Sequence, residues 1–180
     1  MIDKIKELFF NETLRRWHFE DIINESGISR ERVNYFLKEL LREGFIKRIK
    51  PRYKMPYYLT NRNFRRFRSE KKIYGIRIIE QSGLFEHLNS LDNIKTAILF
   101  GSFSRGNWNK SSDIDLFLYG DDKDFDKGIF EKKIKREIQL FSYKDIKKMK
   151  KELDPKLFQN IVKGFNIKES IIPFEVRLNA

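Results

Sequence analysis

The sequence predicts an α+β protein made of two small domains, and three observations support this prediction. Apolar residues recur at helical spacing through residues 2–42, and two short strand-like runs follow them. From Lys95 onward the pattern changes to a continuous apolar run and then to alternation, which is typical of a small mixed sheet with flanking helices. With 40% hydrophobic and 14% aromatic residues, the 180-residue chain has enough apolar material for two small cores.

The N-terminal part is predicted to run helix, helix, helix, hairpin. Gly27 provides the turn before the third helix, and Ser29 stands at its N-cap. A further helix over 64–80 places Phe67, Tyr74 and Ile78 on an apolar stripe and leaves Lys71 among the basic residues outside it. The remaining predicted elements here are helices over 2–10, 19–25, 30–42 and 84–91, and strands over 45–49 and 57–60.

The C-terminal part alternates predicted strands and helices. The expected strands cover 96–100, 114–118 and 138–141, with an edge strand over 174–178; the expected helices cover 125–136, 144–152 and 155–163. We therefore place one domain at 1–60, a basic helical linker and candidate dimerisation region at 61–90, and a second domain at 91–180.

Charge and cysteine content narrow the function classes. The net charge is +12, and residues 41–80 alone hold 13 basic and 3 acidic residues. Net charge by itself fits a polyanionic partner and simple solubility equally well, and its concentration in one segment favours the partner. The absence of cysteine excludes disulfides, thiolate zinc sites and cysteine nucleophiles. With no long apolar run and no signal-peptide pattern, we expect a cytoplasmic, soluble protein.

Two aspartates in the second domain have the spacing of a metal site. Asp113 and Asp115 are two residues apart, so on a strand both carboxylates point to the same face. Neighbouring carboxylates repel each other unless a cation lies between them, and Mg²⁺ or Mn²⁺ suits such oxygen ligands. Alone, this spacing is more often an exposed strand edge.

The residues before the two aspartates favour a metal site over an exposed strand edge. Gly101 follows a predicted buried strand, and its missing side chain lets backbone N–H groups approach phosphate oxygens. The string Gly101-Ser-Phe-Ser-Arg-Gly106 is followed by Ser112-Asp-Ile-Asp-Leu116. These residues resemble the minimal nucleotidyltransferases of the DNA polymerase β superfamily, whose signature is Gly-Ser-x-x-Arg-Gly, a short spacer and Ser-Asp-x-Asp-Leu. The resemblance covers residues 95–119 and, by element order, extends to about 165.

The resemblance implies roles for the site residues. Gly101 and Ser102, together with Ser112, would hold the triphosphate of ATP or another NTP, and Asp113 and Asp115 would coordinate Mg²⁺ or Mn²⁺. Arg105 would contact phosphate or brace the loop, and bracing is the favoured role. These residues would then support attack of an acceptor hydroxyl on the α-phosphate as pyrophosphate leaves.

One position departs from the family pattern. Active members carry a third carboxylate on the next strand, and element order places Gln139 there. A glutamine coordinates weakly and cannot usefully accept a proton. Glu137 lies two residues earlier on the same face, offset by roughly 6–7 Å. Either Glu137 supplies the third carboxylate, or the domain binds nucleotide and metal without efficient transfer.

The N-terminal pattern also suggests a partner. A short turn, a helix with one apolar face and a basic hairpin loop fit double-stranded DNA binding, and the segment resembles the winged-helix domains of prokaryotic transcription regulators. A helical packing domain with a solvated basic face, or an RNA-binding domain, is the alternative. The candidate DNA contacts are Ser29, Arg30, Asn34, Tyr35, Lys38, Lys47, Arg48, Lys50, Arg52 and Lys54.

Three functions follow from these features. The favoured one is an enzyme that transfers a nucleotidyl group to a hydroxyl acceptor; some relatives are antitoxins that modify a partner toxin, so a protein acceptor is included. The second is a transcription regulator that senses nucleotide, and the third is an interaction module with a vestigial catalytic half. A homodimer through residues 61–90 is compatible with each.

Overall fold

The computed structural model describes residues 2–174, and the chain forms two compact units. Unit 1 runs from the N-terminus to Lys71 and includes Trp108–Lys110; unit 2 contains Lys72–Asn107 and the residues from Ser111 onward. The division falls inside α4 (Phe67–Gln81). Within the described residues, no helix combines the length and the apolar character needed to cross a membrane.

Unit 1 contains three helices and a hairpin, at the positions that the sequence predicts. The helices are α1 (Ile2–Asn11), α2 (Phe19–Ser26) and α3 (Arg30–Arg42), and the antiparallel hairpin consists of β1 (Ile46–Ile49) and β2 (Tyr57–Thr60). Gly27 ends α2 with a φ of 63°, as its position before the turn predicts. Ser29 is the N-cap residue of α3, but its side chain makes no capping hydrogen bond.

The expectation for Lys71 was wrong. Its side chain belongs to the buried side of α4 within unit 1, where the residue is 3% exposed. The ammonium group donates a 2.6 Å hydrogen bond to the Phe10 carbonyl and lies 4.7 Å from the ring centroid of Trp108, whose indole N–H donates to the Lys71 carbonyl. A carbonyl and an aromatic face can solvate a buried cation, and neither partner is visible in the periodicity of α4.

Unit 2 contains a four-stranded mixed sheet in the order β5-β4-β3-β6. The central strands β3 (Ile94–Phe100) and β4 (Ile114–Gly120) are antiparallel, whereas β4 and β5 (Ile138–Tyr143) are parallel. The edge strand β6 (Phe165–Asn166) was not expected from the sequence. The edge strand expected over 174–178 lies, except for Phe174, outside the described residues.

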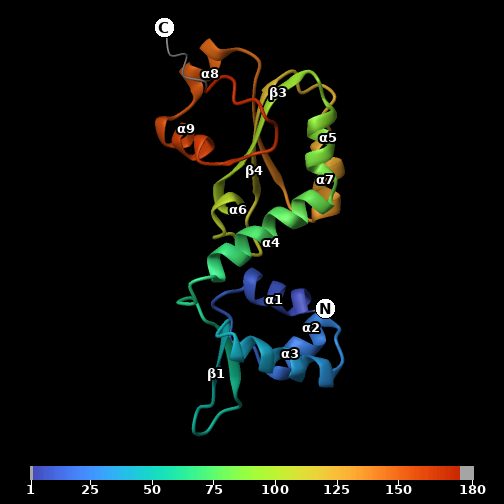
Figure 1. Cartoon of the computed structure of the whole chain (residues 1–180), viewed down its shortest axis with the longest axis vertical. Helices are drawn as coiled ribbons and strands as arrows, with labels where there is room; N and C mark the ends of the chain where they lie inside the picture. The colour runs from blue at the N-terminus through green and yellow to red at the C-terminus, as the bar shows by residue number, and fades with distance from the viewer. Residues whose placement is uncertain (1, 175–180) are drawn as a thin grey trace. The chain divides into compact units, whose positions relative to one another are not determined.

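Helices cover both faces of this sheet. In Figure 1, α5 (Leu84–Ser90) and α7 (Lys127–Ile134) lie on one side of β3 and β4, and α8 (Ile146–Glu152) and α9 (Pro155–Val162) lie on the other. Met149 of α8 and Ile161 of α9 share a buried cluster with Phe100 and Phe117 of the sheet. The short helix α6 (Gly101–Arg105) directly follows β3, so the packed central strands fix the position of the turn that begins it.

Candidate active site

The turn from β3 into α6 is built around a glycine. Gly101 is buried and has a φ of 69°, a left-handed backbone conformation that other residues adopt only at a cost. The Ser104 hydroxyl donates a 3.1 Å hydrogen bond to the Gly101 carbonyl, and the Asn107 N–H donates to the Ser102 carbonyl at 3.1 Å. These two hydrogen bonds stabilise the turn.

Asp115 lies directly against this turn. Phe100, the last residue of β3, pairs with Asp115 on β4, so the register brings the carboxylate to the point where the chain enters α6. A Cβ atom added to Gly101 would lie 1.7 Å from Oδ2 of Asp115. The Ser102 N–H donates a hydrogen bond to the same carboxylate. The tertiary structure thus brings Gly101, Ser102 and Asp115 together.

Burial and neighbouring charges shift the pKa of Asp115. Burial raises the pKa of Asp115 above its usual value, and the negative charge of Asp113 raises it further; the Ser102 N–H and the positive charge of Arg105 act in the opposite direction. Asp113 itself is exposed and immediately precedes β4. Two carboxylates that influence each other beside a glycine turn suit a hard divalent cation, which relieves both burial and repulsion.

Gln139 and Glu137 are the two residues considered for a third ligand beside Asp113 and Asp115. In the parallel register, Asp115 pairs with Gln139, the position at which the sequence resemblance leads us to expect an acid. Glu137 precedes β5; its carbonyl accepts a 2.9 Å hydrogen bond from the Ile114 N–H, and the residue is exposed. Among residues 2–174, no three acidic or histidine side chains form a group able to hold a metal ion. A cation here would therefore have two carboxylates and take its other ligands from water or phosphate.

Two arginines flank the site in different ways. Arg105, on α6, donates a 3.4 Å hydrogen bond to the side-chain oxygen of Asn160 on α9, a contact that fits the bracing role. Arg136, which sequence reasoning missed, donates a 2.9 Å hydrogen bond to the Ser112 carbonyl and lies 5.2 Å from the ring centroid of Phe103. Arg136 therefore joins the segment before Asp113 to α6.

No sequence signal could have revealed the position of Arg136. Its partners are 24 and 33 residues away along the chain, and an arginine beside a glutamate is typical of any solvated helix end. The Ser112 carbonyl is engaged by Arg136, and the residue is half-buried beside the aspartates. Ser112 is thus held close to the site through its backbone.

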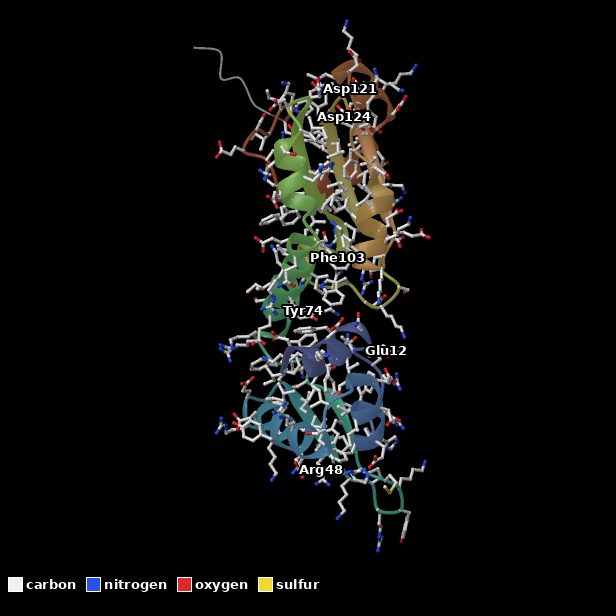
Figure 2. All side chains as sticks on the ribbon, turned by 90° about the vertical axis from the view of Figure 1, so that its right-hand side faces the viewer. Glu12, Arg48, Tyr74, Phe103, Asp121 and Asp124 are labelled. Carbon is white, nitrogen blue, oxygen red and sulfur yellow. The ribbon has the colours of Figure 1, made fainter. Side chains whose placement is uncertain are left out.

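The residues predicted to contact DNA are all on the surface of unit 1. Arg30 is already engaged, because its guanidinium lies 2.7 Å from the Glu20 carboxylate. Tyr35 is 60% exposed on the same helix, α3. Figure 2 shows Arg48 on the hairpin, where side chains ending in nitrogen gather. The exposed set is Ser29, Arg30, Asn34, Tyr35, Lys38, Lys47, Arg48, Lys50, Arg52 and Lys54.

Comparison with known proteins bears on unit 2. A search of the curated proteins found no match to this chain. A family model does match residues 84–170, which contain α5, the sheet, the glycine turn, both aspartates and Gln139. The matched family is described as Polymerase beta, Nucleotidyltransferase, and the match supports a nucleotidyltransferase domain in this part of the chain.

Proposed function

We propose that unit 2 transfers a nucleotidyl group from ATP or another NTP to an acceptor hydroxyl. One observation carries the proposal: Asp115, beside a second carboxylate, lies so close to the turn at Gly101 that an added Cβ atom would be 1.7 Å from its Oδ2 atom. In the reaction, the acceptor oxygen forms a bond to the α-phosphorus, the bond to pyrophosphate breaks, and the acceptor proton leaves to solvent or a base. The family match to residues 84–170 supports this reaction class.

Each site residue has a defined task in this proposal. The absence of a side chain at Gly101 lets Asp115 and a triphosphate approach the same backbone, and the half-buried Ser102 offers its hydroxyl to a phosphate oxygen. Asp113 and Asp115 would hold Mg²⁺ or Mn²⁺, which when bound supplies neutralisation of the phosphate charge. Arg105 keeps α6 against Asn160, so the turn stays aimed at the nucleotide.

Incubation of the full chain with α-labelled ATP, Mg²⁺ and host extract tests this proposal. We expect label on a protein or nucleic-acid acceptor, such as a partner toxin, and loss of that label in Asp113→Asn. A matched control is Asp124→Asn, because Asp124 lies on the loop after β4, away from the turn. Label transfer that persists in Asp113→Asn would contradict the assignment.

A second function is favoured by Gln139. The amide pairs with Asp115 where an acid is expected, so unit 2 could bind nucleotide and report it without turning it over. Under this alternative, the wild type binds ATP tightly and transfers no label, whereas Gln139→Asp gains measurable transfer. Equal transfer by wild type and Gln139→Asp would instead show that two carboxylates suffice.

We further propose that unit 1 is a winged helix that binds double-stranded DNA. The support is its order of three helices and a hairpin, together with exposed polar residues on α3 and exposed cations on the hairpin. With α3 in the major groove, Asn34 is placed to read base edges, and the hairpin cations contact phosphates. The protein would then bring nucleotide chemistry, or nucleotide sensing, to a DNA site and regulate transcription there.

A further inference from the structure

Unit 1 contains a cavity that neither proposed activity uses. Its volume is about 570 Å³, and it lies between the start of α2 and the end of the hairpin loop. One wall includes Arg16, Phe19 and Glu20, and the other includes Lys54, Met55 and Tyr57. A volume in this range, with apolar surface from Phe19, Met55 and Tyr57 and charged groups beside it, is typical of small-molecule sites.

Backbone contacts hold the two walls at a fixed distance. Trp17 and Tyr58 form an isolated antiparallel bridge, with N–H to carbonyl distances of 3.0 and 2.8 Å in the two directions. Next to it, the Nδ1 atom of His18 lies 3.0 Å from the Pro56 carbonyl oxygen. The cavity is therefore a part of the fold that forms without a ligand.

The charges around the cavity are unbalanced. The Glu20 carboxylate, the acidic group of the lining, is already paired with Arg30 at 2.7 Å. Neither Arg16 nor Lys54 forms an ion pair within the described part of the chain; the Arg16 guanidinium lies over the Tyr57 ring, 5.2 Å from its centroid. Two cations without acidic partners beside apolar walls complement an anion that carries an apolar group.

We propose that this cavity binds a small aromatic carboxylate. The aromatic group packs between Phe19 and the Met55–Tyr57 wall, and the carboxylate faces Arg16 and Lys54. Because residues of the hairpin form one wall, the ligand fixes the hairpin against α2. A hairpin fixed in this way should bind DNA with a different affinity. This consequence rests on the proposed DNA-binding function, whereas binding of the ligand to the cavity does not.

Calorimetric titration of the full chain with 2-naphthoate tests the site. We expect binding that weakens about fivefold or more in Arg16→Gln and in Lys54→Gln, and that is lost with the neutral 2-naphthamide. The matched controls are Arg62→Gln and Lys50→Gln, exposed cations outside the cavity lining, which should change the Kd less than about twofold. No binding of 2-naphthoate, equal binding of the amide, or equal effects of all four variants would overturn the proposal.

A measurement of duplex binding distinguishes failure of the cavity proposal from failure of the DNA-binding proposal. Lys50→Gln and Lys54→Gln should weaken duplex binding to a similar degree, whereas 2-naphthoate should shift the duplex affinity of the wild type and not that of Arg16→Gln. If 2-naphthoate binds and no duplex binds at any salt concentration, the cavity proposal stands and the DNA-binding proposal fails. If a duplex binds and 2-naphthoate does not, the reverse holds.

Discussion

Gly101 has a left-handed backbone conformation and lies against the Asp115 carboxylate, so its substitution should affect both stability and activity. In Gly101→Ala, the new Cβ atom would lie 1.7 Å from Oδ2 of Asp115 and would sit on a backbone with a φ of 69°. We expect label transfer to fall about 100-fold or more and the free energy of unfolding to fall by about 1–2 kcal/mol. Gly83→Ala is the control, because Gly83 has a φ of 83° and nothing within 4 Å of an added Cβ. Similar activity losses in both variants would contradict a steric role for Gly101.

We expect the ionised side chain of Asp115 to lower the free energy of unfolding at neutral pH. Its folded-state pKa is raised, so its contribution to stability is present below the unfolded pKa and is lost as pH rises through the folded-state pKa. At neutral pH the ionised carboxylate therefore opposes folding. We expect Asp115→Asn to raise the Tm by about 2 °C at pH 7, with a smaller difference near pH 4, while label transfer is lost. A lower Tm in the variant would contradict this account.

The effect of a divalent cation on the Tm tests whether Asp115 is a metal ligand. A cation that binds only the folded state raises the Tm by mass action. Millimolar Mg²⁺ should raise the Tm of the wild type and leave Asp115→Asn unchanged, with thermal unfolding followed in the presence of excess chelator as the reference. An equal response of both proteins would place cation binding away from Asp115.

Arg136 acts, in our interpretation, as a positioning residue. Arg136→Met keeps apolar packing on Phe103 but removes the hydrogen bond to the Ser112 carbonyl. Because small displacements of a reacting group are expensive, we expect kcat to fall about tenfold with little change in the KM for ATP. Lys132→Met, an exposed cation on α7, is the control. A change confined to KM would indicate direct contact with nucleotide instead.

At the scale of elements, α3 and the hairpin should contribute differently to DNA binding. Asn34→Ala on α3 should weaken binding to a selected duplex by about 1–3 kcal/mol and leave non-specific binding almost unchanged. Arg48→Ala on the hairpin should weaken binding to every duplex alike. Fluorescence anisotropy with the selected and a scrambled duplex distinguishes the two, and Arg42→Ala is the control. Equal loss on both duplexes for Asn34→Ala would contradict base reading by α3.

At the scale of the whole molecule, we expect the distribution of charge to set the strength of the proposed DNA binding. Residues 41–80 hold 13 basic and 3 acidic residues of a chain with a net charge of +12. If five or six phosphates are contacted, log Kobs should fall with log salt concentration with a slope of about −5. Titrations of the full chain between about 50 and 200 mM salt measure this slope. A slope near zero would contradict the DNA-binding proposal.

Local pattern was a good guide to most elements of this chain. Apolar spacing correctly predicted α1–α3, because each of these helices buries one periodic face, and short apolar runs correctly predicted the hairpin and the central strands. The run at β3 is continuous because this strand is buried almost throughout. It failed for β6, whose two residues are too short to show a period, and for Lys71, whose partners are a backbone carbonyl and a distant ring. Element order placed Gln139 on the strand after Asp115, and the parallel register pairs these two residues. That Gln139 occupies the third acid position stays a prediction.

The sequence by itself determined the chemistry available to this protein: a glycine turn, two aspartates with strand spacing, a glutamine beside them and a basic N-terminal half. These features are local in the chain, so residue type and spacing specify them. Only the tertiary structure decided that Asp115 presses against Gly101, that Arg136 reaches Ser112 and that a cavity opens beside the hairpin. Each depends on strand register or on packing between segments far apart in sequence, and no local pattern records such contacts.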